Sequence, residues 1–427
     1  MVAAVLVCSE ANLLFFWPMP RRLIPIVFLT FVNTIGFSIL IPVLPFVVER
    51  YGSSPFMYGV LLSAYSLCQF LAAPLIGSLS DKFGRRPTLL LSQLGTFLSW
   101  LIFGAAYFIP ENVSASFTAF SLPLVVIAFS RVIDGITGGN ISVTNAYVAD
   151  ITPPEQRTRR FGLLGAVMGF GFVVGPALGG YTASFSIGYL GTVIAAAVIS
   201  LITLVVTYFY LTESLTHDEL NHKLNIHLLK ELNIFAKLRQ FTGNTFTKQL
   251  FIRRIFFALA FAAFTSTFAL YAKDILELDA KRLGFLLLFI GLFSILNQSM
   301  IAHRVAKRLG DYPTFNLGQF VLMLSIAGLA LRPGLIGFIV LMYLTNLGMS
   351  LSMPTFKSLL TGTVDKSRQG QITGLDESLL AGSNGVAPLI AGALYGVWSA
   401  HAFGVFSILL LLPLLYFFPY NRPDDTV

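Results

Sequence analysis

The chain contains twelve apolar runs, each close to the length that a helix needs to cross a bilayer. Such a helix requires about 20 mainly apolar residues, whereas a strand of a membrane barrel needs only about 9–11 and alternates in polarity. The runs are too long and too uniformly apolar for barrel strands. The sequence therefore predicts an all-helical (all-α) integral membrane protein with twelve spans, at residues 23–48, 57–79, 87–109, 119–141, 161–184, 188–211, 250–272, 283–302, 313–331, 334–354, 371–395 and 400–419.

The composition agrees with this class of protein and excludes the soluble classes. Charged residues make up 11% of the 427 residues and hydrophobic residues 56%, whereas a soluble domain carries about 25% charged residues. Such a chain has too little charge to cover a surface that faces water. Disorder, a collagen-like rod and an ordinary cytosolic enzyme are excluded together.

Cofactor and metal chemistry find no support in the sequence. The two cysteines, Cys8 and Cys68, form no disulfide framework. His217, His222 and His227 are five residues apart, so they do not share a helical face, which needs a spacing of three or four. The nucleotide-binding pattern G-x-x-x-x-G-K-[S/T] is absent. We expect no cofactor, no metal site, no use of ATP and no enzymatic activity.

The basic residues are distributed unevenly between the two sides of the predicted membrane protein. Apart from Arg131, the 28 lysines and arginines lie outside the spans or at their ends, and most of them, including those between 212 and 254, share a side with both termini. The loops on the other side hold only Arg50, Lys273, Lys281, Arg282 and Arg332. Because cytoplasmic loops are enriched in Lys and Arg, both termini are predicted to be cytoplasmic. The net charge of +8 then reflects topology and attraction to anionic lipid, and no nucleic-acid partner is needed.

The longest polar stretch, 212–249, divides the spans six plus six. Within it, apolar residues recur every three or four positions, which predicts an amphipathic helix on the membrane surface, at Leu224, Leu228, Leu232, Phe235 and Leu238. The expected organisation is a cytoplasmic segment, a six-helix bundle, a cytoplasmic linker, a second six-helix bundle and a cytoplasmic tail, at 1–22, 23–211, 212–249, 250–420 and 421–427.

The two halves also repeat one another. Pro176 in the fifth span and Pro388 in the eleventh have glycines at the same offsets, fourteen residues before and four after, namely Gly162 and Gly180, and Gly374 and Gly392. This shared register indicates a duplicated six-helix unit, with a binding site expected near the midplane between the halves.

Few charged residues fall within the predicted spans, and they are Arg131, Asp134, Asp376 and Glu377. An ionisable side chain costs roughly 2.5–3.5 kcal/mol at mid-depth, so it usually faces a cavity or a partner. Arg131 and Asp134 share a helix face, where they either take part in proton coupling or neutralise each other as a structural pair. Glu377 either carries a proton in a desolvated site or, together with Asp376, stabilises the positive N-terminal end of its helix.

Uncharged polar side chains in the membrane region form the predicted substrate cavity. They are Asn33, Gln69, Asn145, Asn297, Gln298 and Asn346. With 40 Phe and 9 Met residues in the chain, they fit an adaptable, aromatic cavity for amphipathic ligands. Each of them could equally form a hydrogen bond between helices.

The loop between the second and third spans carries the most specific motif. Its glycines and proline predict a tight turn, and its acid and arginines can pair or cap helix ends at the membrane surface. The loop reads Gly77-Ser-Leu-Ser-Asp81-Lys-Phe-Gly84-Arg85-Arg86-Pro87. It resembles the signature motif of the major facilitator superfamily, G-x-L-x-D-x-x-G-R-[R/K].

Further segments agree with this resemblance. Arg131-Val-Ile-Asp134-Gly135 lies in the fourth span, and Gly171-Phe-Val-Val-Gly175-Pro176-Ala-Leu-Gly179-Gly180 in the fifth resembles the antiporter motif of drug:proton exchangers. Ile41-Pro42-Val-Leu-Pro45, and the stretch from Ala146 to Arg157 that contains Asp150, are similar to tetracycline efflux proteins. The resemblance covers roughly 23–420 and implies the major facilitator fold, in which two six-helix bundles rock around a central cavity.

The resemblance also implies roles for these residues. Arg131, with Asp134, is expected near the proton pathway. The gating loop is expected to comprise Gly77, Asp81, Gly84, Arg85, Arg86 and Asp150. The antiporter motif is expected to seal the outer side, because its glycines leave one helix face bare and its proline bends the helix; its residues are Gly171, Gly175, Pro176, Gly179 and Gly180.

The chain departs from the tetracycline exporters at two positions. Those proteins carry an aspartate in the first span and another in the third, where this chain has Asn33 and Ser99. Neither residue binds a proton or holds a cation by charge, which puts tetracycline itself in doubt. In the second half, the copy of the loop motif has Lys307 at the aspartate position.

We expect a monomeric, proton-coupled exporter, or antiporter, of a small amphipathic drug or metabolite, which works by alternating access. Its other partners would be protons and the lipid bilayer, and its location a bacterial inner membrane as a multi-pass protein. The alternatives are an importer or symporter of a nutrient or siderophore-like solute, and a transporter-like receptor or scaffold.

Overall fold

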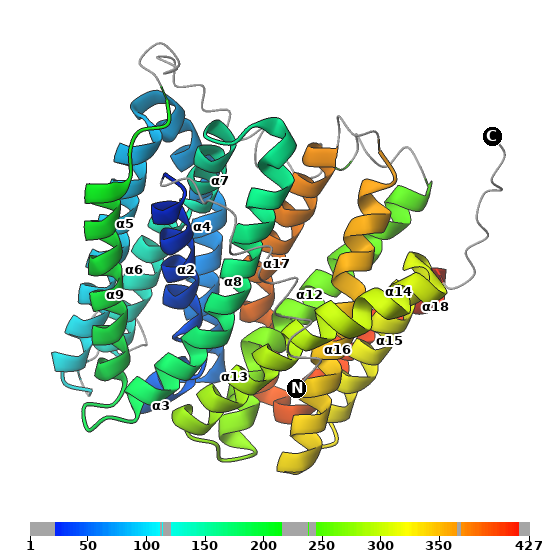
Figure 1. Cartoon of the computed structure of the whole chain (residues 1–427). Coiled ribbons are helices and arrows are strands. Elements are labelled where there is room, and N and C mark those ends of the chain that lie inside the picture. The colour runs from blue at the N-terminus through cyan, green and yellow to red at the C-terminus, as the bar shows by residue number, and fades with distance from the viewer. Residues whose placement is uncertain are drawn as a thin grey trace, which may run out of the picture.

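The computed structural model describes residues 22–111, 113, 121–215, 238, 245–364 and 369–417 (Figure 1). Its described part is almost entirely helical. The predicted N-terminal segment, the tail and nearly all of the predicted amphipathic linker helix lie outside these residues.

The first half contains eight helices among its described residues. They are α2 (Ile24–Ser38), α3 (Leu44–Arg50), α4 (Pro55–Phe83), α5 (Arg85–Ala105), α6 (Leu122–Gly138), α7 (Ile141–Asp150), α8 (Pro154–Ala183) and α9 (Tyr189–Tyr210). In the second half, a π-helical turn at Asn297–Ala302 follows α13. The α-helices of that half are α12 (Thr245–Asp274), α13 (Ala280–Leu296), α14 (His303–Leu309), α15 (Asp311–Leu329), α16 (Leu335–Thr361), α17 (Gln369–Trp398) and α18 (Ala402–Phe417).

Each predicted span overlaps at least one helix in the described part of the chain. By length and apolar composition alone, eight helical segments in the described part of the chain could cross a membrane, and α17 and α18 together count as one of them. The twelve-span prediction is consistent with this result, since the remaining spans correspond to α2, α13 and α15, of which α2 and α13 have only 15 and 17 residues. The all-helical membrane class is confirmed.

Two predicted spans are interrupted rather than continuous. The first, 23–48, breaks after Ser38 and resumes as α3 at Leu44, because Pro42 lacks a backbone N–H and disfavours helix in the residue before it. Pro45 lies in the first turn of α3, where proline is tolerated. The fourth, 119–141, ends as α6 at Gly138, and α7 then continues it to Asp150. The prediction of one continuous helix over 23–48 was wrong, whereas the fourth predicted span lies within a single apolar segment long enough to cross a membrane, Leu122–Asp150, which extends beyond its predicted end.

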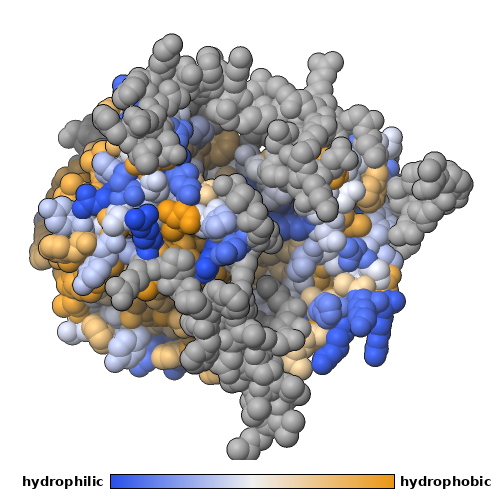
Figure 2. Space-filling view, turned by 45° about the horizontal axis from the view of Figure 1, so that its top comes forward, coloured by the Kyte–Doolittle hydropathy of each residue, from blue (hydrophilic) through white to orange (hydrophobic). Residues whose placement is uncertain are grey.

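Large hydrophobic side chains are exposed on the flanks of the molecule. Leu91 is 69% exposed, Phe209 72% and Leu415 68%, and Figure 2 shows hydrophobic residues over one flank and hydrophilic ones at the upper end. Such a surface is costly in water but is the expected one in lipid, where apolar side chains face the hydrocarbon core.

The two halves share a hydrophobic core at one end only. The largest buried cluster joins both halves, through Tyr58 and Trp100 from the first and Phe264 and Tyr395 from the second. At the other end, each half keeps a separate cluster, around Tyr147 in the first half and around Phe315 and Phe356 in the second. We call the first the joined end and the second the loop-motif end; the latter lies at the top of Figure 1, and Figure 2 shows its surface recessed between the two lobes.

Candidate transport site

Glycines allow the two halves to meet at the joined end. At Gly180 of α8, a Cβ atom would overlap the carbonyl oxygen of Ala280 in α13, and at Gly284 it would overlap that of Pro176. The backbones of α8 and α13 therefore touch directly, which only small residues allow. We call this contact the α8–α13 seam.

A second seam repeats this geometry on the opposite side of the molecule. At Gly59 of α4, a Cβ would overlap the carbonyl oxygen of Pro388 in α17, and at Gly392 it would meet that of Pro55 at 2.5 Å. In both seams, the carbonyl oxygen of the proline (Pro176 or Pro388) meets a glycine of the opposite half, and the glycine four residues later (Gly180 or Gly392) meets a backbone carbonyl oxygen of that half. The register that the sequence repeats in the fifth and eleventh spans corresponds to the two seams between the halves.

The other glycines of the predicted antiporter motif lie elsewhere. A Cβ at Gly171, Gly175 or Gly179 would meet Thr34, Ser38 or Ile39 of α2, a helix of the same half. The bare face therefore packs α8 against its own bundle. Only Pro176 and Gly180 of this motif lie at the seam. The predicted role in sealing the outer side therefore remains for these two residues, and the other three glycines pack α8 within its own half.

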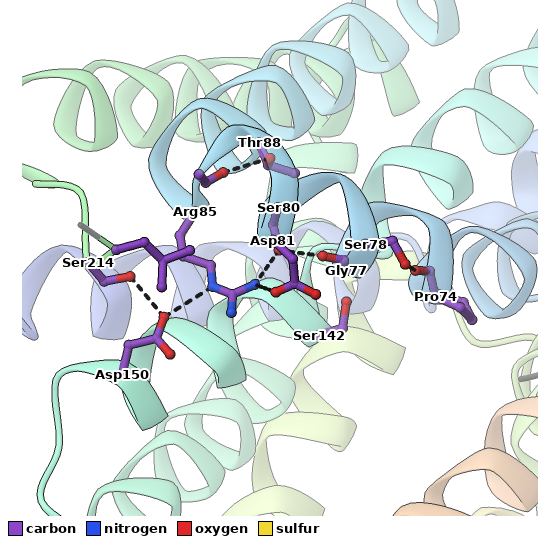
Figure 3. Close-up of polar contacts among 12 residues, drawn as sticks. Pro74, Gly77, Ser78, Ser80, Asp81, Arg85, Thr88, Ser142, Asp150 and Ser214 are labelled. Atoms are coloured by element: carbon purple, nitrogen blue, oxygen red, sulfur yellow. Dashed lines mark hydrogen bonds and ion pairs between the residues drawn. The ribbon is translucent and has the colours of Figure 1, made fainter. Parts of the chain in front are cut away.

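The loop motif forms a compact polar network around Arg85 (Figure 3). Gly84 has a φ of +100°, a conformation that favours glycine, and ends α4 immediately before α5 begins. The guanidinium of Arg85 donates to Ser80 at 2.6 Å, to Asp81 at 2.5 Å and to Asp150 at 3.1 Å. The structure thus brings together three predicted gating residues from α4, α5 and α7. Gly77 accepts a hydrogen bond from Ser80 on its carbonyl oxygen.

Glu213 completes this network, although sequence reasoning did not single it out. Its carboxylate accepts hydrogen bonds from the backbone N–H groups of Arg85 and Arg86, at 2.9 and 3.0 Å. It therefore caps the positive N-terminal end of α5 from a position just after α9. Arg86 in turn donates to the carbonyl oxygen of Tyr208 at 2.7 Å. No spacing in the sequence links residue 213 to residue 85.

Glu213→Ala is expected to lower the free energy of unfolding by about 0.5–2 kcal/mol, the usual cost of a lost N-terminal cap. The measurement is the Tm of the purified protein in detergent. Glu213→Gln keeps an acceptor oxygen and removes the charge, so its Tm should fall less. A Tm that is unchanged in Glu213→Ala contradicts the capping role.

The second half has a counterpart of this loop with its charge reversed. Gly310 has a φ of +83°, like Gly84, and the residue after it is Asp311 instead of an arginine. Asp311 accepts a hydrogen bond from Ser358 of α16 at 2.5 Å. The turn and the link to a neighbouring helix are retained, with an acceptor in the place of the Arg85 donor.

Arg131 and Asp134 form a buried ion pair on α6. Their charged atoms are 3.0 Å apart, and the side chains are 4% and 6% exposed. The guanidinium lies over the rings of Trp100 and Phe103, at 4.8 and 5.4 Å from the ring centres. Its Nε and Nη2 atoms are buried and have no hydrogen-bond partner among the described residues. The predicted pairing is therefore observed, and the arginine keeps donors that can take a further partner.

Asp376 and Glu377 have very different surroundings. Glu377 is 56% exposed and pairs with Lys357 of α16 at 3.2 Å, so of the two alternatives for this residue the desolvated proton site is not observed. Asp376 is fully buried and pairs with Arg254 of α12. Arg254 and the adjacent Arg253 are each 2% exposed. From the sequence, both arginines were counted with the basic residues of the linker side, and their burial inside the second bundle, in the first turns of α12, was not foreseen.

Most of the predicted cavity residues are engaged in hydrogen bonds between helices. Gln93 donates to Asn33 at 3.0 Å, and Asn33 donates to Asn140 at 3.1 Å, which joins α5, α2 and the start of α7. Gln69 donates to the carbonyl oxygen of Gly138, where α6 ends.

The second half has a similar amide contact and two residues that stand apart. Asn297 donates to Asn346 at 3.2 Å. Asn145 is exposed on α7, and the side chain of Gln298 lies outside the described residues. Ser99, which stands at the third-span position where the tetracycline exporters carry an aspartate, donates to the carbonyl oxygen of Thr96 on its own helix.

Two helical bundles joined at one end, with ion pairs buried in membrane-embedded helices, define a membrane transporter of small molecules. A family model of the Major Facilitator Superfamily matches residues 26–383. The chain belongs to this family, as its loop motif suggested.

The curated relatives include several resistance proteins. The chain is 30% identical over 405 residues to the tetracycline resistance protein, class C, of Escherichia coli, and the match covers 92% of this chain and 96% of that protein. It is 26% identical to multidrug resistance protein 2 of Bacillus subtilis, with 86% of each chain covered.

Solved structures agree with the fold. The human organic anion transporter MFSD10 (TETRAN) superposes with a TM-score of 0.67 and 22% identity, over 93% of this chain and 99% of that one. A bacterial homologue of the human lysosomal transporter Spinster superposes with a TM-score of 0.72 and 11% identity, over 94% and 97%. At these identities the likeness concerns the fold alone.

Proposed function

We propose that this protein is a proton-coupled exporter of small amphipathic compounds that works by alternating access. The observation that carries the proposal is the arrangement of the cores and seams. The halves are joined by two glycine seams at one end, and each keeps its own core at the other. A rocking motion that breaks the seams and joins the opposite ends would expose a central site to each side in turn.

The distribution of basic residues supports a cytoplasmic location for the loop-motif end and both termini, in a bacterial inner membrane. The described conformation is then closed toward the outside. The domain boundaries stay as proposed from the sequence, with bundles at 23–211 and 250–420 and a linker at 212–249. We propose that the protein acts as a monomer, with small-molecule substrate, protons and the bilayer as its partners.

The likeness to a tetracycline resistance protein and a multidrug resistance protein supports export of drugs, and tetracycline is one candidate substrate. Asn33 lies in a chain of amides with Gln93 and Asn140, an uncharged environment that holds ligands by hydrogen bonds rather than by charge. We therefore propose a substrate that does not require an acidic partner in the first span.

For proton coupling, we propose the pair Arg131 and Asp134, and for gating, the network of Asp81, Arg85 and Asp150. A proton that binds Asp134 would weaken its attraction to Arg131, whose unpartnered Nε and Nη2 atoms are available to another acceptor. The Arg85 network would tie α4, α5 and α7 together as one body when the halves move.

The test uses the wild-type protein in liposomes of anionic lipid, with a panel of labelled tetracyclines, cationic dyes and neutral amphipathic drugs. Counterflow, the exchange of labelled for unlabelled substrate, reports alternating access, and an imposed pH gradient reports coupling. We expect the substrate to cross the membrane in the direction opposite to the flow of protons. Movement with the protons indicates an importer, and absence of counterflow for every compound in cells and liposomes indicates a receptor or scaffold.

A further inference from the structure

The second bundle contains a buried ion pair that links two helices. In α12, Arg254 donates through Nε and Nη2 to the two carboxylate oxygens of Asp376 in α17, at 2.5 and 3.1 Å. The side chains are 2% and 0% exposed. Such a fork-to-fork contact fixes both groups in orientation as well as in distance.

A third helix also contacts the pair. Arg254 contacts Met353 Sδ of α16 at 3.0 Å, and its guanidinium lies over the ring of Phe356 at 4.8 Å. The adjacent Arg253 donates to the neutral oxygens of Gln319 and Asn316. Asp376 is therefore the carboxylate that balances the charge of Arg254 within the described part of this bundle.

The ion pair differs from the Arg131–Asp134 pair in the relation between its partners. Arg131 and Asp134 lie on one helix and remain neighbours however the helices move. Arg254 and Asp376 lie on two helices, and α17 is the helix whose Pro388 and Gly392 form the seam with the other half. A change in this ion pair can therefore alter the position of a helix that joins the two bundles.

Stability alone is a weak reason to retain such a pair. Replacing a buried ion pair by well-packed apolar residues is often neutral or stabilising, because each ion loses its hydration on burial. Ionisable residues within membrane helices more often mark proton or ion pathways. The charged groups around Asp376 are Arg254 on α12, Lys357 on α16 and the adjacent Glu377 on α17.

We propose that Asp376 is a second proton-coupling carboxylate and that Arg254 is its positioning residue, so that protonation of Asp376 loosens α17 from α12 and eases separation of the α4–α17 seam. When Asp376 binds a proton, its negative charge is lost and Arg254 keeps its proton, so one attractive charge pair disappears. This inference rests on the proposed proton-coupled transport and extends it to the second bundle.

The test compares counterflow with transport driven by a pH gradient in liposomes, using a substrate that the wild-type protein carries in both assays. Asp376→Asn should retain counterflow and lose about tenfold or more of the gradient-driven transport, the usual scale for a positioned proton-transfer group. The double variant Arg254→Met with Asp376→Leu replaces the pair by apolar side chains and should behave in the same way. Ser378→Ala, on the exposed side of the same helix, is the matched control and should transport normally.

Normal gradient-driven transport by the folded double variant overturns the proposal. Loss of both counterflow and gradient-driven transport in that variant, with an unchanged Tm, also overturns it, because the pair would then be needed for movement itself. A wild-type protein that exchanges substrate but does not respond to the pH gradient refutes the proposed coupled function instead, and this is seen before any variant is made.

Discussion

Gly180→Leu is expected to abolish active transport while leaving the protein folded in the membrane. Any side chain at this position meets the backbone of Ala280 in the opposite half, so the α8–α13 seam cannot close. Forcing extra volume into a packed contact costs about 1–3 kcal/mol, and about 1.4 kcal/mol already changes the ratio of two conformations tenfold. The measurement is gradient-driven transport in liposomes, together with the Tm of the purified protein.

Two other glycines of α8 serve as matched controls. Gly175→Leu places the same side chain against Ser38 of α2, within one half, so it should lower the Tm. Gly162→Leu faces open space and should leave both the Tm and the transport near wild type. If Gly180→Leu transports normally, or if it loses stability to the same extent as Gly175→Leu, the seam is not the contact that opens and closes.

Arg131→Lys is expected to reduce gradient-driven transport by about tenfold or more, on the scale of a lost proton-transfer group, while counterflow persists. Lysine keeps the positive charge beside Asp134 but loses the planar fork and its stacking over Trp100. Asp134 would then bind and release its proton without the guanidinium held in a fixed orientation beside it. Both assays on the same liposomes give the ratio that measures coupling.

The same substitution at an exposed arginine controls for general effects. Arg282 is 73% exposed at the start of α13, and Arg282→Lys should leave both assays unchanged. An Arg131→Lys protein that couples as well as wild type would falsify the role of this residue and would leave a merely neutralised pair on α6.

The fold could be predicted from the sequence because the bilayer imposes a length on each span. Apolar runs near 20 residues leave helix as the only arrangement that satisfies every backbone hydrogen bond in lipid. Breaks within spans were harder to foresee, since Pro42 lies in the break after α2 while Pro74 and Pro176 lie inside continuous helices. Whether a proline interrupts a helix depends on neighbours that can replace the lost hydrogen bond, and these come from other helices.

The candidate site was predictable where its partners are close in the chain. Arg131 and Asp134, and Asp81 and Arg85, are three or four residues apart, and both pairs are observed. Among partners that are distant in sequence, Asp150 was grouped with Arg85 through the family resemblance, and others were not found.

Arg254 and Glu213 illustrate this limit, because Glu213 stood in the predicted linker and Arg254 at the start of the span that follows it. Their partners, Asp376 and the N-terminal end of α5, are brought to them only by the packing of the bundles. The distribution of charges along the sequence predicts on which side of the membrane a residue lies. It does not reveal whether the side chain of an arginine is buried inside a helical bundle.

The two seams are built mainly from backbone atoms and glycines, with apolar side chains such as Leu67 and Val173 packed beside them. The energy of such contacts depends mainly on the volume of the groups that meet, and little on charge or on hydrogen bonds between side chains. Residues such as Asn33 or Asn145 can therefore change during evolution without retuning the balance between the two conformations. In such a protein the choice of cargo and the mechanics of the cycle are separable traits, and resistance to a new compound can arise by substitutions that leave the moving parts untouched.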